Sequence, residues 1–211
     1  MKHFVNNRNK YLSRLASGLD VLDVGCVNHN LNQYRDGGWL HEDLKRVAKS
    51  VIGIDYEADC IKTLQAEGYD VICADATNFN LGDSFDLIIA GEILEHLGNT
   101  DGFLSCARKH LRSSGKLVIT VPNAGSLNYA VQNIFYGHEV DNPDHCCLYS
   151  ETTLRRLLER HGLEVESVGY CPEQVWDGKG LSWWCRQVLQ YACAPFRPNL
   201  LHHLIMVASP S

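Results

Sequence analysis

The stretch Leu19–His29 constrains the fold of this chain more than any other. It holds a short apolar run, made of Val21, Leu22 and Val24, and then Gly25. The aliphatic residues predict a buried strand, and Gly25 permits a sharp turn after it because glycine has no Cβ that would clash. A strand that ends in such a turn and leads into a helix is typical of nucleotide-binding α/β domains, in which the ligand lies beyond the carboxyl ends of the strands.

The next hundred residues continue this alternation. Strands are predicted where apolar residues run together, and helices where apolar residues recur at helical spacing. The predicted strands are 20–24, 51–55, 69–74, 85–90 and 115–121, and the predicted helices are 6–17, 40–48, 58–67 and 100–111. This order predicts an α/β fold with a doubly wound, Rossmann-like and mostly parallel sheet.

The pattern is looser after Pro122. A helix is predicted at 124–136, an amphipathic helix N-capped by Ser150 ends near Gly162, and strands are predicted at 163–170 and 203–208. The 211 residues are predicted to form a single domain, 1–211. Within it we distinguish a substrate-side segment, 123–150, and an aromatic helical insert, 172–198.

The insert is rich in aromatic side chains, which are Trp176, Trp183, Trp184, Tyr191 and Phe196. The expectation is that they pack a helix onto the sheet. The alternatives are a lid over an apolar acceptor or a surface that contacts lipid.

Charge and cysteine content exclude some classes of protein. The formal net charge is −6, which argues against nucleic-acid binding because that needs clustered Lys and Arg. The nine cysteines are scattered with no C-x-x-C pair, so we expect no disulfide framework and a cytoplasmic location. No apolar run is long enough to cross a membrane, and the first residues hold no apolar signal region.

The residues after Gly25 disfavour a phosphate ligand. A dinucleotide fold places further glycines there so that the backbone can approach a pyrophosphate, but Val27, Asn28 and His29 occupy those positions. An adenosyl ligand without a phosphate does not need this approach. S-Adenosyl-L-methionine (SAM) is therefore the candidate ligand.

Acidic residues follow the next two predicted strands. Asp55 ends the second strand, where a carboxylate can accept hydrogen bonds from both ribose hydroxyls. Asp75 ends the third strand, where it can receive the adenine amino group, with Ala76 beside the ring. Successive strand ends therefore predict a site for an adenosyl group.

Five segments together resemble the class I SAM-dependent methyltransferases. They read VLDVGC at 21–26, IGID at 52–55, CADA at 73–76, FDLIIAGEILEHL at 85–97 and LRSSGKLVITVPN at 111–123. The Glu-x-x-Glu-His-Leu motif is similar to that of the ubiquinone-biosynthesis-like subgroup. The resemblance covers about 21–162 and implies a seven-stranded sheet with an antiparallel last strand. The chain departs from the family pattern at Val27 and His29, where glycines are usual.

The resemblance also implies which residues bind the cofactor. Gly25 and Cys26 would line it, Asp55 would hold the ribose, and Glu92 would lie near the methionine part or the substrate. The full predicted set is Asp23, Gly25, Cys26, Asp55, Tyr56, Asp75, Ala76 and Glu92.

The motif after the fourth strand predicts either a metal site or a base. If 92–96 is helical, Glu92, Glu95 and His96 share one face, and with His145 they could bind a divalent metal, as similar residues do in small-RNA 2′-O-methyltransferases. We do not favour a metal. The other interpretation makes His96 or His145 a general base, because an imidazole titrates near neutral pH and a hydroxyl loses its proton when it is methylated.

The sequence therefore predicts an enzyme, a SAM-dependent methyltransferase that acts on a hydroxyl of a small-molecule, sugar or lipid-like acceptor. Two alternatives stay open. One is a metal-assisted RNA 2′-O-methyltransferase, and the other is a SAM-binding protein without catalytic activity.

Overall fold

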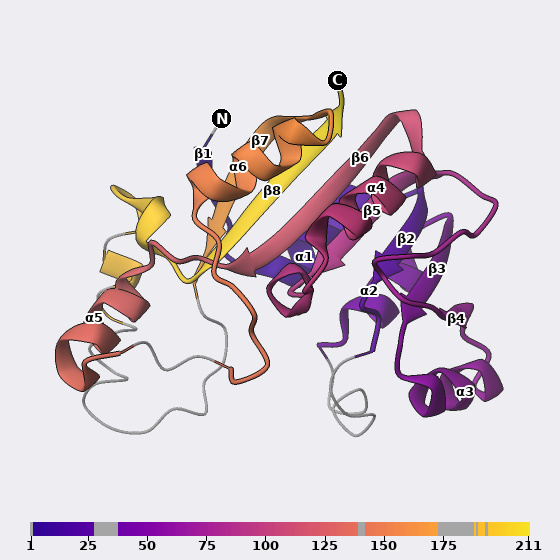
Figure 1. Ribbon diagram of the computed structural model, residues 1–211, viewed down its shortest axis with the longest axis horizontal. Helices are drawn as coiled ribbons and strands as arrows, with labels where there is room; N and C mark the ends of the chain where they lie inside the picture. Colours follow the sequence, from indigo (N-terminus) through magenta and orange to yellow (C-terminus); the bar gives the residue numbers. More distant parts are fainter. Residues whose placement is uncertain (1, 28–37, 139–141, 173–187, 189, 193) are drawn as a thin grey trace.

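An eight-stranded sheet forms the centre of the protein in a computed structural model, which describes residues 2–27, 38–138, 142–172, 188, 190–192 and 194–211. The strands are β1 (Lys2–Phe4), β2 (Asp20–Val24), β3 (Ser50–Asp55), β4 (Val71–Cys73), β5 (Phe85–Gly91), β6 (Leu111–Pro122), β7 (Leu163–Cys171) and β8 (His203–Pro210). Their order across the sheet is β1-β7-β8-β6-β5-β2-β3-β4 (Figure 1). Strand β8 runs antiparallel to β6 and β7, and the other neighbours pair in parallel.

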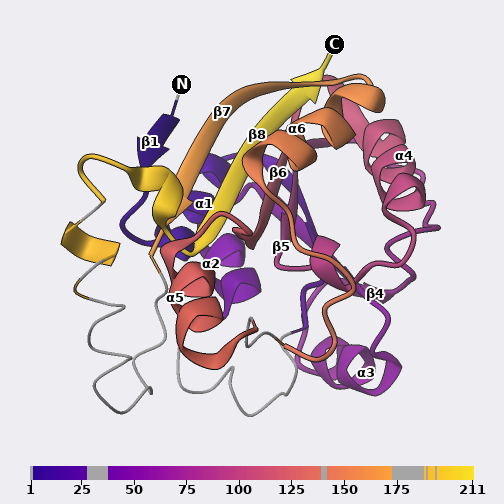
Figure 2. The same ribbon diagram turned by 60° about the vertical axis from the view of Figure 1, so that its left-hand side comes forward.

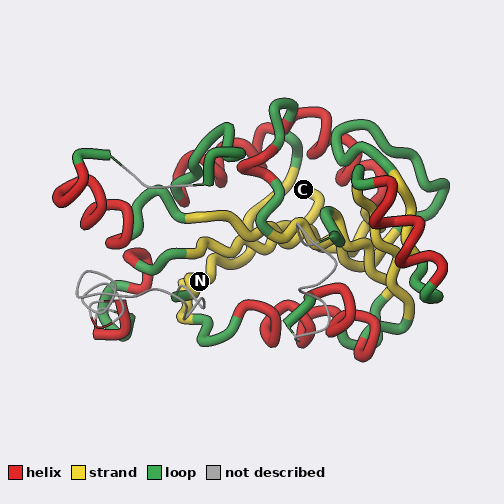
Figure 3. The backbone as a smooth tube through the Cα atoms, turned by 90° about the horizontal axis from the view of Figure 1, so that it is seen from below, coloured by secondary structure: helices red, strands yellow, loops and turns green. Residues whose placement is uncertain are grey.

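Helices lie on both faces of the sheet, as the view along it shows (Figure 3). Alternate residues of a strand point to opposite faces, so Val21 and Leu22 of β2 belong to two different apolar clusters. The helices α1 (Arg8–Ala16) and α2 (Leu40–Val47) bury Leu12 and Leu44 against the face of Val21. The opposite face is covered by α4 (Thr100–His110) and α6 (Glu151–Arg160).

The remaining helical elements lie near the ends of the strands. Helix α3 (Ala58–Ala66) packs beside β4, and its Ile61 and Leu64 are buried there. Helix α5 (Leu127–Tyr136) follows β6 and extends beyond the end of that strand (Figure 1, Figure 2). Two short 3-10 turns, η2 (Leu94–His96) and η3 (Pro198–Leu200), complete the described elements.

The doubly wound α/β class, the antiparallel last strand and the N-cap at Ser150 are confirmed. The predicted count of seven strands is wrong, because β1 pairs in parallel with β7 at the sheet edge. Three residues are too short a run to show a strand pattern, and this pairing joins opposite ends of the chain. The predicted helix that ended at Leu111 also stops one residue early, since Leu111 begins β6.

Much of the predicted insert, 172–198, lies outside the described residues, including Trp176, Trp183 and Trp184. Of its aromatic residues, Tyr191 and Phe196 are described, and both are exposed. The segments 123–150 and 172–198 therefore remain predictions. No helix in the described part of the chain is long and apolar enough to span a membrane.

The parallel strands β2, β3 and β5 end side by side. Val24 is paired with Ile54 on one side and with Ala90 on the other. The loops that leave these three strands therefore start from one edge of the sheet, which is where a ligand binds in such folds.

Candidate functional site

A cleft of about 510 Å³ opens at this edge of the sheet. Loops that follow β2, β3, β4 and β5 line it, together with one residue of α1 and one from the loop before α6. The lining residues are Arg8, Gly25, Val27, Ile54, Asp55, Tyr56, Glu57, Ala74, Ala76, Gly91, Glu92, Ile93, His96, Leu97 and Asp144. The volume is in the usual range of small-molecule sites, about 300–1,000 Å³.

Gly25 is required by the shape of the loop after β2. Its φ is +78°, a region that side chains disfavour, and a Cβ added there would lie 3.0 Å from Cδ1 of Ile93. The N–H groups of Gly25 and Cys26 both donate to the carbonyl of Ile54, at 2.9 and 3.2 Å. The predicted turn at Gly25 is thus present, and Gly25 lines the cleft.

Cys26, which is in the predicted binding set, is not among the residues that line the cleft. It is buried against Gly53, where an added Cβ would lie only 2.7 Å from the Cys26 sulfur. Burial, together with the nearby charges of Asp23 and Asp55, raises the pKa of this thiol, so it stays protonated. Cys26 therefore acts as a small apolar residue of the core.

Asp23 is likewise directed into the interior and away from the cleft lining. It is 2% exposed, and its Oδ2 lies 2.9 Å from Nδ1 of His41, which is also buried. The indole N–H of the adjoining Trp39 donates to the Cys26 carbonyl. These contacts fix α2 to the glycine turn, so Asp23 supports the loop from behind.

Asp55 lies in the cleft and is held by backbone donors. Its Oδ2 accepts from the N–H of Val27 at 3.0 Å, and its Oδ1 accepts from the N–H of Glu57 at 3.1 Å. Burial raises its pKa, and these backbone bonds partly offset that rise. Since each carboxylate oxygen has two lone pairs, Asp55 retains the capacity to accept further hydrogen bonds. Tyr56, the predicted neighbour, also lines the cleft.

Asp75 and Ala76, the two predicted binding residues after β4, differ in their position relative to the cleft. Ala76 lines the cleft, whereas Asp75 is not part of the lining. The Oδ1 of Asp75 accepts from both the N–H and the hydroxyl of Thr77, at 2.7 and 2.8 Å. A short local turn therefore occupies one oxygen of this carboxylate, as Asp side chains often do.

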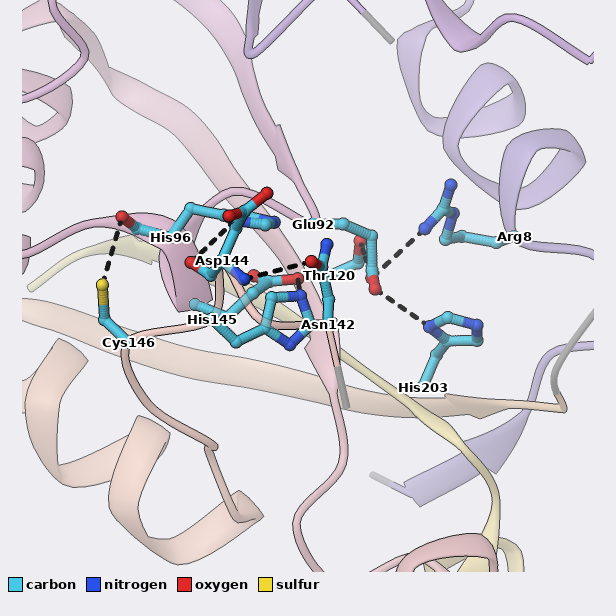
Figure 4. A network of polar contacts seen from close by, with 10 residues as sticks. Arg8, Glu92, His96, Thr120, Asn142, Asp144, His145, Cys146 and His203 are labelled. Carbon is cyan, nitrogen blue, oxygen red and sulfur yellow. Dashed lines mark hydrogen bonds and ion pairs between the residues drawn. The ribbon is translucent and has the colours of Figure 1, made fainter. Parts of the chain in front are cut away.

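Glu92 follows β5 directly and lines the cleft. It has φ +54° and is the one non-glycine residue with positive φ in the described parts of the chain, a conformation that costs about 1–2 kcal/mol. Its Oε1 accepts from Thr120 at 2.8 Å and lies 3.2 Å from Arg8, and its Oε2 lies 3.1 Å from Nδ1 of His203 (Figure 4).

The charge on Glu92 is well stabilised. Burial opposes ionisation of the carboxyl, but the charges of His203 and Arg8 and the hydrogen bonds from His203 and Thr120 outweigh it, so its pKa lies below the ordinary range. Sequence reasoning missed Arg8, Thr120 and His203. No local pattern marks them, because each comes from a different element that reaches Glu92 only in the folded chain.

The predicted cluster of Glu92, Glu95, His96 and His145 is only partly assembled. The helical turn η2 begins at Leu94, and the positive φ of Glu92 turns the chain before it, so Glu92 does not share a face with the other two motif residues. Glu95, His96 and His145 each place one potential ligand atom within 4.8 Å of the others. Three of the four residues named for the metal alternative, which we do not favour, therefore converge.

His96 and His145 lie edge to face, with ring centroids 4.6 Å apart. His96 lines the cleft, and its Nδ1 lies 3.3 Å from the carbonyl of Asp144. His145 is behind it, with Nε2 4.0 Å from Oε1 of the buried Glu95. Of the two predicted bases, His96 is therefore the one exposed to the cleft.

The cleft thus has two sides. The β3 side, formed by Gly25, Val27, Asp55 and Ala76, contains most of the predicted binding residues. The β8 side is a charged network centred on Glu92, in which Arg8 and Glu92 line the cleft while Thr120 and His203 contact Glu92 from outside the lining (Figure 4).

Comparison with known sequences agrees with this geometry. Residues 2–168 match the model of a methyltransferase domain family. The mitochondrial ubiquinone biosynthesis O-methyltransferase of Rattus norvegicus is 30% identical over 204 residues, which is 89% of this chain and 56% of that protein. The Homo sapiens protein of the same name is 32% identical over 167 residues, which is 72% of this chain and 43% of that protein. The chain spans about half the length of these relatives.

Solved structures share the fold at lower identity. A SAM-dependent methyltransferase from Archaeoglobus fulgidus is 22% identical with a TM-score of 0.59, over 94% of this chain and 89% of that one. Magnesium protoporphyrin IX methyltransferase from Synechocystis, solved with bound S-adenosylhomocysteine (SAH), is 14% identical with a TM-score of 0.64, over 96% of this chain and 82% of that one.

Proposed function

This chain belongs to the class I SAM-dependent methyltransferase family, and we propose that it transfers a methyl group from SAM to a hydroxyl oxygen of a small-molecule acceptor. The observation that carries the proposal is the cleft itself. It joins a side with a ribose-binding type of carboxylate, Asp55, to a side with a second, charged carboxylate, Glu92. The hydroxyl acceptor follows from the relatives, which are named as O-methyltransferases.

The residues of the β3 side fit SAM. Gly25 lines the cleft and packs so closely on Ile93 that an added Cβ would lie 3.0 Å from Cδ1 of Ile93, and the carboxylate of Asp55 has oxygens with remaining acceptor capacity. We assign Asp55 to the ribose hydroxyls and Ala76 to the adenine ring. Arg8 and Glu92 carry opposite charges at one end of the cleft, which suits an amino-acid group with a positive and a negative end.

When bound, SAM supplies a methyl group activated by a sulfonium sulfur. The protein's part is to hold the acceptor oxygen in line with that methyl group, and orientation of this kind is worth up to about 7–11 kcal/mol of a barrier. A base must also take the hydroxyl proton. His96 lines the cleft, so it stays the predicted base, and His145 lies behind it.

A small-molecule partner also agrees with the net charge of −6, which disfavours a phosphate-rich acceptor. We retain the cytoplasm as the proposed location. It is supported by the cysteine content, since scattered cysteines without pairing motifs are typical of reducing compartments. Fractionation of cells that produce the protein tests it.

Two measurements test the proposed function. Calorimetry with SAH should show binding to a single site. Radiolabelled SAM should then transfer its label to members of a panel of catechols, phenols and sugar alcohols. Binding without transfer to any of these, but with transfer to a short RNA, would favour the RNA alternative. Binding without transfer to anything would leave a SAM-binding protein without activity, and no binding would overturn the proposal.

A further inference from the structure

A buried histidine, His41, lies behind the turn that follows β2, outside the cleft lining. We propose that His41 is a positioning residue for SAM, an inference that rests on the proposed function. Its hydrogen bond to Asp23 sets the shape of the glycine turn, residues 25–27, and thereby the affinity of the cleft for the cofactor.

Asp23 and His41 form a buried polar pair. The two residues are 2% and 1% exposed, and Oδ2 of Asp23 lies 2.9 Å from Nδ1 of His41. A carboxylate without a proton can only accept hydrogen bonds, so Nδ1 carries the hydrogen in this contact. Taking a carboxylate out of water costs free energy unless donors replace the water. His41 is therefore needed to keep the Asp23 carboxylate in the interior.

The second ring nitrogen of His41 shows which contact this side chain serves. Nε2 is buried and has no hydrogen-bond partner among the described residues. A buried polar atom without a partner costs free energy, and an apolar ring would avoid that cost. The bond from Nδ1 to Asp23 is therefore the interaction that favours a histidine over an apolar residue at this position.

The pair is packed directly against the backbone of the glycine turn. Asp23 pairs with Gly53 of β3, and a Cβ added at Gly53 would lie 2.8 Å from Cε1 of His41 and 2.7 Å from the sulfur of Cys26. The N–H of Cys26 donates to the carbonyl of Ile54, next to Gly53. Because His41 and Cys26 fill one space above Gly53, a displacement of His41 would displace the turn.

The start of α2 contacts the segments that form the cleft at two further points. The indole N–H of Trp39 donates to the carbonyl of Cys26 at 2.8 Å. Leu40 packs against Gly91, where an added Cβ would lie 3.5 Å from Cδ2 of Leu40, and Gly91 lines the cleft. The start of α2 therefore connects the turn after β2 with the end of β5, and His41 lies between these two contacts in the helix.

Neighbouring rings limit the freedom of the His41 side chain. The ring centroid of His41 lies 5.3 Å from that of Trp39 and 6.0 Å from that of Tyr69. The hydroxyl of Tyr69 in turn donates to Glu42 of α2 at 2.9 Å. In such a close-packed environment the imidazole keeps one orientation, with Nδ1 directed at Asp23.

A turn that is fixed in advance lowers the cost of binding the cofactor. Gly25 and Val27 of the turn line the cleft, and the N–H of Val27 donates to Asp55, which we assign to the ribose. A loop that already has its bound shape loses less entropy on binding than a loop that must be ordered. Loss of the bond between His41 and Asp23 should therefore weaken SAM and SAH binding and leave the methyl-transfer step itself unchanged.

Two substitutions of His41 separate its hydrogen bond from its packing. His41→Phe keeps a ring but removes the donor, whereas His41→Asn keeps an N–H near the position of Nδ1 but removes the ring. We expect His41→Phe to raise the SAH dissociation constant, measured by calorimetry, by about 10-fold or more, and His41→Asn to stay within about three-fold of the original. The KM for SAM should follow the same order, while kcat at saturating SAM stays within about three-fold in both variants.

His110→Phe is the matched control. His110 is 2% exposed and forms hydrogen bonds with both ring nitrogens, but it lies in α4 and outside the cleft lining. This variant should lower the Tm and leave the SAH affinity within about two-fold. An unchanged SAH affinity in folded His41→Phe would overturn the inference. So would a loss in His41→Asn, or in the control, as large as the loss in His41→Phe, because the bond to Asp23 would then not be its cause.

Gly53→Ala covers the case in which His41→Phe fails to fold because Asp23 is left buried without its donor. It keeps both members of the pair, but the new Cβ requires His41 or Cys26 to move. Gly98→Ala is the control, since an added Cβ there meets no atom within 4 Å. We expect Gly53→Ala to bind SAH about 10-fold more weakly than Gly98→Ala, and equal affinities would overturn the inference. A wild-type protein that does not bind SAH would instead refute the proposed function.

Discussion

The two sides of the cleft hold their carboxylates in different ways. On the β3 side, Asp55 is held by the backbone N–H groups of Val27 and Glu57. On the β8 side, Glu92 is held by the side chains of Arg8, Thr120 and His203. Every residue other than proline supplies a backbone N–H, whereas the second arrangement needs three particular side chains from distant parts of the chain.

This difference explains why an unusual glycine loop can still form a site. The family pattern has a glycine where this chain has Val27, but Val27 contributes its N–H to Asp55, and that group does not depend on the side chain. The β3 side therefore tolerates sequence change in the loop and responds mainly to loss of Asp55 itself. The β8 side should respond to each of its members.

The largest effect should come from removing the centre of the β3 side. Asp55→Ala removes a carboxylate that we assign to two ribose hydroxyls, and hydrogen bonds to charged groups contribute about 1.5–3 kcal/mol each. We expect the SAH dissociation constant to rise by about 10²-fold or more, measured by calorimetry, with the protein still folded by circular dichroism. Asp59→Ala, an exposed acid of α3, is the control and should stay within about two-fold. An unchanged affinity in Asp55→Ala would refute the ribose assignment.

The two sides of the cleft also differ in how well their residues could be predicted from the sequence. The turn at Gly25, the acid at Asp55 and the small residue at Ala76 lie at strand ends, and strand ends are visible as the limits of apolar runs. Asp23 and Cys26 belong to the same motif but are buried, because β2 is covered on both faces and the residues around α2 pack against its turn, which a one-dimensional pattern does not resolve. Arg8 and His203 could not be predicted, since only the order of strands in the folded sheet places them beside Glu92.

The contribution of Glu92, on the β8 side, to the stability of the fold should depend on pH. The folded-state pKa of Glu92 lies below its ordinary value, so its contribution to stability is fully present above the unfolded pKa, about 4.3, and is lost as the pH falls through the folded pKa. Glu92→Gln removes the charge, and we expect it to lower the free energy of unfolding by about 1–2 kcal/mol at pH 7.

The difference in the free energy of unfolding between Glu92→Gln and the wild-type protein, measured by urea denaturation, should become smaller as the pH falls below about 4.3. Glu164→Gln, at an exposed position of β7, serves as the control and should stay within about 0.5 kcal/mol of wild type. A gap between Glu92→Gln and wild type that is the same at all these pH values would show that the charge of Glu92 does not stabilise the fold.

The smallest effect should come from chelators, which test the cluster of Glu95, His96 and His145. Glu95, His96 and His145 can each offer one ligand atom, but the second carboxylate of the motif, Glu92, contacts Arg8 and His203 instead. Mg²⁺ prefers six oxygen ligands, and one carboxylate with two imidazoles is a poor match. We therefore expect methyl transfer to change by less than about two-fold after dialysis against EDTA or 1,10-phenanthroline. A loss of activity that Mn²⁺ or Zn²⁺ restores, and that His145→Gln reproduces, would instead assign this group to catalysis.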